Sequence, residues 1–281
     1  MRQFNLSFFV IAALLSVNSF AQSPRIDIKK GQKYQVITEN KVNSVASAMG
    51  QEMENNSNNT VTTLHEVKDL EKGEIKLESK ITRLQSEVQA MGQSVTFDSD
   101  KKDNEGPSAE EMAKIVNKTK TIKFDGKGMM IKADTPEEDD IVSGLMNGIS
   151  PMSTNMELFI PEFSNVDFKV GDTFPKNDEI KEEKKTSKEV GVYTIVSIEN
   201  GIASITYAGT IDLEGTMEQM GMEMNIKSSG KMTSEIKYDT KTRLVISSLS
   251  TTDTDMTVDA SGMTIPAKVK TTGKVTVSLV N

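Results

Sequence analysis

Cysteine and tryptophan are both absent from this chain of 281 residues, and histidine occurs once. Without cysteine there can be neither a disulfide nor a lipid attached to a cysteine thiol. A single histidine and no thiolate also leave too few ligands for a zinc centre. We therefore expect the protein to be stabilised by packing, with no metal and no cofactor.

Aromatic residues make up 5% of the chain, whereas methionine occurs 17 times, so the sequence predicts an aliphatic and deformable core. The formal net charge is −8, and lysines alternate with acids instead of clustering. Such a chain would repel nucleic acid, which we exclude as a partner. No glycine-rich phosphate loop follows any predicted strand, so nucleotide binding is not expected either.

The first residues have the pattern of an export signal. Arg2 supplies a positive charge, residues 8–17 are mostly apolar, and small residues precede the expected cleavage site after Ala21. The apolar stretch is shorter than the roughly 20 residues that a membrane-spanning helix needs. We expect residues 1–21 to be a signal peptide and residues 22–281 to form one domain in the periplasm or outside the cell.

A period of two dominates the second half of the sequence. From residue 202 to residue 238, apolar residues such as Ile205 and Tyr207 alternate with polar residues such as Thr206. This alternation is typical of strands with one apolar face. A run of about twelve residues at about 3.3 Å each spans about 40 Å, which favours a strongly bent antiparallel sheet or half-barrel.

The same order of motifs occurs twice. Gly31 to Tyr34 resembles Gly171 to Phe174, and the turn at Gly73 resembles the turn at Gly201. We predict an internal duplication of approximately residues 26–134 and 160–280, joined by a helical connection at residues 135–159. The alternative is that both halves merely share the turn residues common to hairpins.

Two segments carry helix signals. Ser108 and Glu111 have the spacing of a capping box, which predicts a helix over Ser108 to Asn117. Pro136 and the acids after it fit the first turn of a helix ending near Asn147. The fold class predicted from these signals is α+β, mostly antiparallel β, with two repeated halves forming a long curved sheet and two short helices covering its concave side.

No catalytic constellation is evident. His65 lies in an expected strand among threonine and valine, where an exposed surface residue is the simpler interpretation. Ser228 and Lys231 have the spacing of a Ser-x-x-Lys pattern, but they lie in a strand or turn and not at a helix start. We predict no catalytic residues and no enzymatic activity.

Three polar stretches, residues 54–59, 98–106 and 176–189, are interpreted as loops or solvated strand ends. The aspartates within residues 98–103 and 253–259 lack the ligand spacing of a calcium loop. Copper capture by methionine would need closer spacing or nearby histidine. No metal site is predicted.

Methionine clusters suggest an adaptable apolar surface. The residues predicted to line a ligand site are Leu145, Met146, Met220, Met222 and Met224. The functional hypothesis is a non-enzymatic envelope protein that binds an apolar or lipid-like ligand between the curved sheet and the helices. The alternative is a structural or protein-interaction module of the cell envelope in which the same methionines fill the core.

The opening Ile28 to Tyr34, the return of this pattern at Val170 to Phe174, and the signal end at Phe20 to Gln22 resemble a family of uncharacterised secreted proteins common in Bacteroidota. This resemblance extends over nearly the whole mature chain and implies no activity. At the level of fold, long antiparallel strands with short helices are similar to lipoprotein carriers of the periplasm. That similarity implies an open half-barrel that cradles acyl chains.

Overall fold

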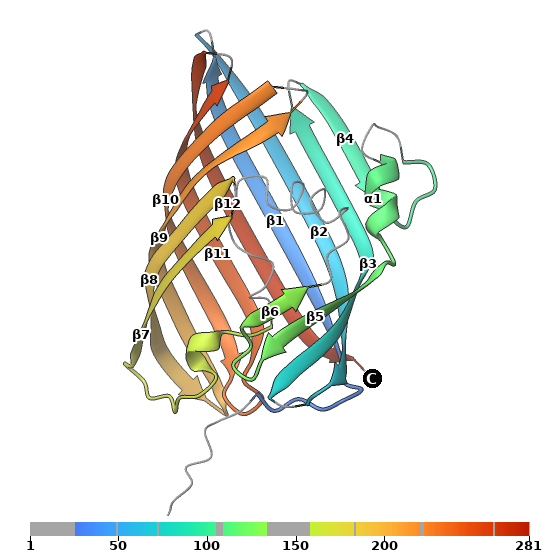
Figure 1. The fold of residues 1–281 in the computed structure, drawn as a ribbon, viewed down its shortest axis with the longest axis vertical. Coiled ribbons are helices and arrows are strands. Elements are labelled where there is room, and N and C mark those ends of the chain that lie inside the picture. The colour runs from blue at the N-terminus through green and yellow to red at the C-terminus, as the bar shows by residue number, and fades with distance from the viewer. Residues whose placement is uncertain are drawn as a thin grey trace, which may run out of the picture.

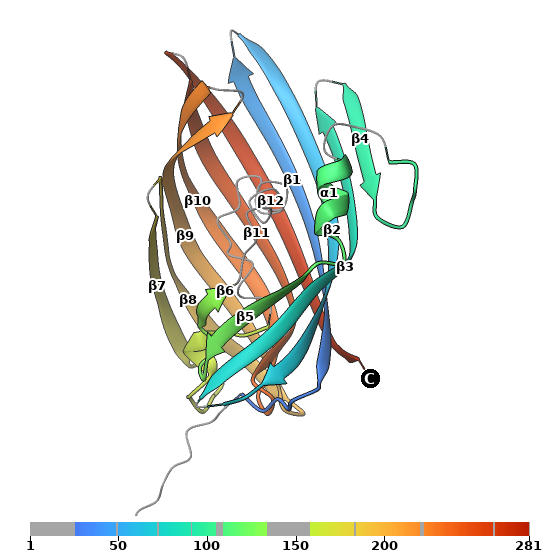
Figure 2. The same cartoon turned by 45° about the vertical axis from the view of Figure 1, so that its right-hand side comes forward.

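One antiparallel sheet of twelve strands makes up most of the computed structural model (Figure 1). The structure describes residues 26–48, 50–71, 73–90, 92–104, 109–133, 158–182, 184–219, 222–260 and 262–280. Figures 1 and 2 show the strands bending together around a concave inner face. The long polar–apolar alternation of the sequence produces this architecture, because each strand presents alternate residues to opposite faces.

Strands and helices follow one another along the chain as β1 (Lys33–Ala48), β2 (Gln51–Asp69), β3 (Glu74–Ala90), β4 (Gln93–Asp98), α1 (Ala109–Ile115), β5 (Thr119–Asp125), β6 (Met130–Ala133), the 3₁₀ turn η2 (Pro161–Phe163), β7 (Thr173–Glu182), β8 (Lys185–Glu199), β9 (Ile202–Gln219), β10 (Met222–Asp239), β11 (Leu244–Ala260) and β12 (Met263–Val280). In space the order is β6-β5-β3-β2-β1-β12-β11-β10-β9-β8-β7, and β4 also pairs with β3.

The first and last strands meet in the middle of the sheet. β1 pairs with β12 from Lys33 opposite Val280 to Ala46 opposite Ala267. Every other long pairing joins strands that are consecutive in sequence, through tight turns. At two of these turns, Gly50 and Gly92 adopt φ near +78°, a conformation that only glycine reaches without strain. These are the glycines of the two Ala-Met-Gly-Gln repeats in the sequence.

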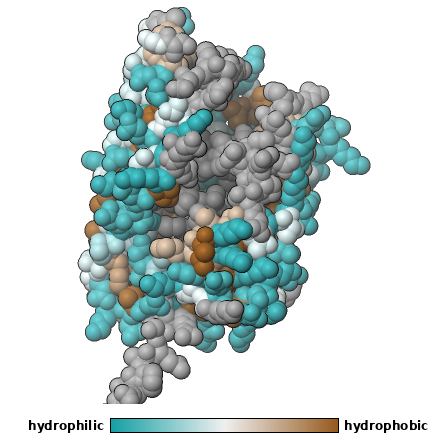
Figure 3. Space-filling view, in the orientation of Figure 1, coloured by the Kyte–Doolittle hydropathy of each residue, from teal (hydrophilic) through white to brown (hydrophobic). Residues whose placement is uncertain are grey.

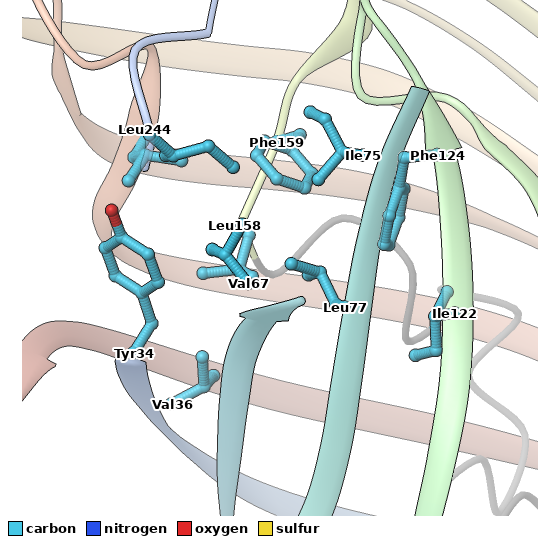
Figure 4. Close-up of a cluster of buried hydrophobic side chains, with 11 residues drawn as sticks. Tyr34, Val36, Val67, Ile75, Leu77, Ile122, Phe124, Leu158, Phe159 and Leu244 are labelled. Atoms are coloured by element: carbon cyan, nitrogen blue, oxygen red, sulfur yellow. The ribbon is translucent and has the colours of Figure 1, made fainter. Parts of the chain in front are cut away.

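The end of the concave face away from these turns is filled by the segment that leads into η2. Leu158 and Phe159 pack against buried side chains of β1, β2, β3 and β5, as Figure 4 shows. The Phe159 ring meets Phe124 edge-on, with centroids 5.1 Å apart. Gly128 is required beside it, because a Cβ at this position would overlap the Phe159 side chain. The residues of this cluster are Ile28, Tyr34, Val36, Val67, Ile75, Leu77, Ile122, Phe124, Leu158, Phe159 and Leu244.

A second cluster surrounds Phe163, which is completely buried. Its ring makes edge-on contacts with Phe168, Phe174, Tyr193 and Tyr238 at centroid distances of 5.0 to 5.5 Å. Such geometry is favourable because the positive ring edge meets the negative face. This cluster gathers aromatic side chains from β7, β8 and β10 around one ring.

The predicted α+β class, with two helices covering the concave side, is wrong. The described residues are nearly all in strands, and they contain one α-helix, α1, of seven residues. Met112 and Ile115 of α1 pack against Val61 and Leu84 near the β3–β4 edge of the sheet. The helix predicted for Pro136 to Asn147 lies outside the described residues. Strand propensity of the long alternating runs accounts for the predominance of strands among the described residues.

The polar stretches predicted as loops or frayed ends are also strands in two of three cases. Residues 54–59 lie within β2, and residues 176–189 form most of β7 and the start of β8. Their polar side chains did not prevent strand formation, because the flanking residues of each strand are held by complete pairing with a neighbour.

The proposed duplication stays a prediction, and one detail of the backbone favours it. Gly31 donates to Val67 O at 2.8 Å, and Gly171 donates to Ile195 O at 2.8 Å. In both places the following residue, Gln32 or Asp172, uses its side-chain oxygen to accept the amide of the residue three positions earlier. The two corners thus have the same hydrogen-bond pattern at the start of β1 and of β7.

Replacement of Phe163 by alanine tests the aromatic cluster. We expect Phe163→Ala to lower the free energy of unfolding by about 3–5 kcal/mol, because a buried ring is lost and the surrounding rings cannot close the cavity. Urea denaturation measures this change. Val196→Ala is the matched control: Val196 is 52% exposed, and we expect a change of about 0.5 kcal/mol or less. Equal effects of the two variants would contradict the assignment.

Candidate binding site on the concave face

Residues directly opposite each other in antiparallel strands point to the same face, so the register defines the concave surface. Tyr34 and Val36 of β1 are buried, so the even-numbered residues of β1 point toward the concave face. The residues paired with them, strand by strand across β12, β11, β10 and β9, point toward the same face. One row across the middle of this face is polar and small: Ser86, Asn59, Asn40, Gly273, Ser250 and Ser234. The Ser86 hydroxyl donates to Asn59 Oδ1 at 2.7 Å within this row.

Beyond the polar row, toward the turns at Gly50 and Gly262, apolar side chains reappear on the concave face among buried threonines such as Thr252, Thr254 and Thr271. We call this region the tip-side patch and define it by Ile211 of β9, Met232 of β10, and Ala267 and Val269 of β12, each at most 8% exposed. Small residues separate these side chains, including Gly209 opposite Met232 and Gly230 opposite Ile211. The floor of the patch is therefore shallow, with backbone close to its surface.

A buried charged group lies beside the tip-side patch, at the β7 edge of the sheet. Lys176 is inward on β7, and its side chain is 1% exposed. Its ammonium nitrogen lies 3.3 Å from a carboxylate oxygen of Asp178 and 3.4 Å from one of Glu189 on β8. Burial of an ammonium group is costly unless it is paired, and these two carboxylates supply that pairing.

Two more titratable side chains complete what we call the Lys176 cluster: Glu162 of η2 and Tyr207 of β9. Burial raises the pKa of Glu162, and the negative charges of Asp178 and Glu189 add to this, while Lys176 opposes it. The Tyr207 ring lies close over the backbone of Gly191 and Gly209. A Cβ on either glycine would overlap the Tyr207 hydroxyl, so both positions need glycine. Burial and the neighbouring Glu189 carboxylate raise the pKa of Tyr207.

His65 is not the exposed residue that the sequence suggested. It lies inward on β2, is 7% exposed, and its Nδ1 is 2.6 Å from the Ser79 hydroxyl. Burial lowers the pKa of His65 to about 4, and the charge of Lys120 contributes to this. A serine and a histidine in contact are not sufficient for hydrolysis, and Ser79 is fully buried, so no substrate carbonyl reaches it in this conformation.

The predicted lining residues are not brought together in the described part of the chain. Leu145, Met146 and Met220 lie outside it. Met222 begins β10, and Met224 is half-buried on β10, opposite Ala260. The structure therefore leaves the predicted set untested as a site. The Lys176 cluster was missed because its charged run was interpreted as a solvated edge, although Lys176 and Asp178 share the parity of Phe174.

The remaining candidates are separated by the strand geometry. Ser228 and Lys231 differ in parity and point to opposite faces of β10, so they cannot act together. The Asp98 carboxylate accepts the backbone N–H of Asp100 at 3.1 Å and lies 3.6 Å from Arg83. Among the described residues, no group of three or more acidic or histidine side chains has the geometry to hold a metal ion.

Hydrophilic side chains cover much of the surface seen in Figure 3, with a brown patch where β6 lies in Figure 1. Met129, Met130 and Ile131 account for exposed apolar area there. No helix in the described part of the chain is long and apolar enough to cross a membrane.

Residues 133–245 match a family model described as a family of unknown function, DUF6263. The chain is therefore similar to that family over the segment from β6 to the start of β11. No curated protein matches the chain in sequence.

Among solved structures, one described as "Lipid-protein interactions in lipovitellin" aligns over 90% of this chain with a TM-score of 0.50 and 11% identity. The aligned region is 25% of that protein, so the likeness concerns the fold of one part of it. An outer membrane channel from Pseudomonas putida F1 aligns over 92% of this chain and 98% of its own, at 9% identity and a TM-score of 0.28.

The buried His65 predicts acid sensitivity. Since its pKa falls from 6.5 to about 4 on folding, the unfolded chain binds a proton between these values that the folded protein does not. The free energy of unfolding is therefore undiminished by His65 above pH 6.5, where the imidazole is neutral in both states. It decreases as the pH falls from 6.5 toward 4, because only the unfolded chain takes up the proton. We expect the unfolding free energy of the wild type to drop by about 2 kcal/mol more than that of His65→Gln between pH 7 and pH 5.

Urea denaturation of both proteins at several pH values measures this difference. The carboxylates titrate equally in the two proteins, so the comparison isolates the imidazole. Parallel pH profiles would show that folding does not lower the pKa of His65.

Proposed function

We propose that this is a non-enzymatic exported envelope protein that binds an apolar or lipid-like ligand against the tip-side patch of its concave face. The observation that carries the proposal is the patch itself. Ile211 and Val269 are inward apolar side chains of a broad curved sheet that belong to neither packed cluster, and Met232 beside Ile211 borders the cluster around Phe163. Inward apolar side chains at the margin of a packed cluster are the kind of place where an apolar ligand binds.

The shape of the patch suits a flexible chain more than a flat ring. Gly209 and Gly230 lie beside its apolar side chains, so an acyl chain could run close to the backbone there. Met232 adds an unbranched and adaptable contact. The opposite end of the concave face is not available to a ligand, because Leu158, Phe159 and Phe163 pack there.

The likeness to lipovitellin supports the proposal at the level of fold. That structure is described in terms of lipid–protein interactions, and the aligned part has a sheet similar to this one. Since the identity is 11%, no lining residue is transferred from it. The basis for export is the signal pattern of residues 1–21, which predicts that the mature protein begins after Ala21.

The second candidate function is a structural or interaction module of the envelope with a filled core. The two aromatic and aliphatic clusters favour it, because they close one end of the concave face completely. In the first function the tip-side patch contacts a ligand, and in the second it contacts only other side chains of the protein. Direct measurement of bound ligand distinguishes them.

Extraction of the purified protein with organic solvent, followed by mass spectrometry, tests the proposal. We expect a co-purifying lipid or fatty acid in the wild type, because the patch would hold it through purification. We expect little or none in Val269→Asp, which places a charge in the patch, or in Ala267→Leu, which fills the groove without adding a charge.

The matched control is Val192→Asp, since Val192 is 43% exposed on the outer face. Circular dichroism verifies that each variant is folded, and a displaceable fluorescent fatty acid measures affinity. A clean extract of the wild type together with no fatty-acid binding would exclude the proposed function and favour the filled-core alternative.

A further inference from the structure

The Lys176 cluster contains more negative than positive groups. Three carboxylic acids, Glu162, Asp178 and Glu189, surround one ammonium group. Asp178 is 54% exposed, whereas the side chain of Glu189 is 14% exposed. Among the described residues of the cluster, acidic groups therefore outnumber basic ones.

Two carboxylate oxygens of the cluster lack a hydrogen-bond donor. Glu189 Oε1 and Glu162 Oε2 are buried and have no hydrogen-bond partner in the part of the chain that the structure describes. A buried carboxylate oxygen without a donor costs about 1–3 kcal/mol or more. Folded proteins rarely leave such groups unsatisfied, so these oxygens are available to accept hydrogen bonds from a ligand.

Tyr207 gives an independent indication. The residue is 2% exposed, and its hydroxyl oxygen lies beside Glu189 without a well-formed hydrogen bond. The bare backbone of Gly191 and Gly209 lets the ring lie flat so that its hydroxyl reaches the cluster. An alanine at either glycine would displace the ring. The sheet is therefore shaped to bring this hydroxyl to the carboxylates.

We propose that the Lys176 cluster binds the ammonium head group of an amphiphile whose apolar tail lies on the tip-side patch. This inference rests on the proposed function and names the class of ligand. An ammonium group carries three N–H donors, which match the two unsatisfied carboxylate oxygens and the Tyr207 hydroxyl oxygen. Hydrogen bonds of this kind, between charged partners, are the stronger ones.

The register connects the cluster with the patch. Glu189 is directly opposite Ile211, and Lys176 is in the row that continues through Gly191 and Gly209 to Met232. A ligand with its head at Glu189 would therefore lay its tail along Ile211 and Met232. Asp178 is half-exposed at the outermost strand, so the β7 edge offers a route by which the head group reaches the cluster.

Three probes of equal chain length test the inference: decylammonium, decanol and decanoate, each titrated into the full mature protein at pH 7 by calorimetry. We expect decylammonium to bind about tenfold or more tightly than decanol, since one charge-assisted hydrogen bond accounts for that factor. Decanoate should bind more weakly than decanol, because the carboxylates would repel it.

Two variants distinguish loss of head-group recognition from loss of protein stability. Tyr207→Phe removes one oxygen and no charge, and Glu189→Gln removes one charge. Both should bring the decylammonium affinity several-fold closer to that of decanol. Glu214→Gln, on an exposed outer-face residue paired with Lys227, should leave the preference unchanged. Circular dichroism and urea denaturation verify folding, and Tyr207→Phe remains informative if Glu189→Gln fails to fold.

The outcomes distinguish the two proposals. Equal affinities of the three probes for the wild type would overturn the ammonium site while leaving apolar binding intact. Binding of none of them would overturn both. A preference for decylammonium that persists unchanged in Tyr207→Phe and Glu189→Gln would place the cationic site elsewhere and also overturn the inference.

Discussion

The strict alternation of side chains along the strands is the constraint on which this structure depends. Each strand places one set of residues on the charged outer surface and the other on the concave face, and a register shift of one residue would exchange them. The aromatic clusters, the polar row, the tip-side patch and the Lys176 cluster are all consequences of one register maintained across neighbouring strands. Among the described residues the sheet is the dominant element, so the registers carry most of the specificity.

The sequence predicted the local character of the chain better than its assembly. Alternation from residue 202 onward indicated strands where β9 and β10 lie, and the capping box at Ser108 lies beside α1. The interruption of strand pairing along β3 could not be foreseen: β5 covers residues 74–80 and β4 covers residues 85–90. Contacts between residues distant in sequence decide which strands become neighbours, and local sequence patterns do not predict these contacts.

The site was harder to predict for the same reason. A run of lysines and acids is ordinarily solvated, and the burial of Lys176 near Glu162 of η2 makes this one unusual. The alternation within the run held a signal, since Phe174, Lys176 and Asp178 share parity and Phe174 belongs to the core. Methionine content, by contrast, pointed to residues that are mostly outside the described chain, and it is a property that cores and binding surfaces share.

The pairing of β1 with β12 has a consequence for how the protein is made. Lys33 pairs with Val280, so β1 cannot form this pairing until β12 has been synthesised. Closing a loop of this length is slow, and until it happens both strands expose an unsatisfied backbone edge that invites aggregation. Pairing of these two strands, which lie far apart in the sequence, is therefore expected to be a slow step in the folding of the sheet.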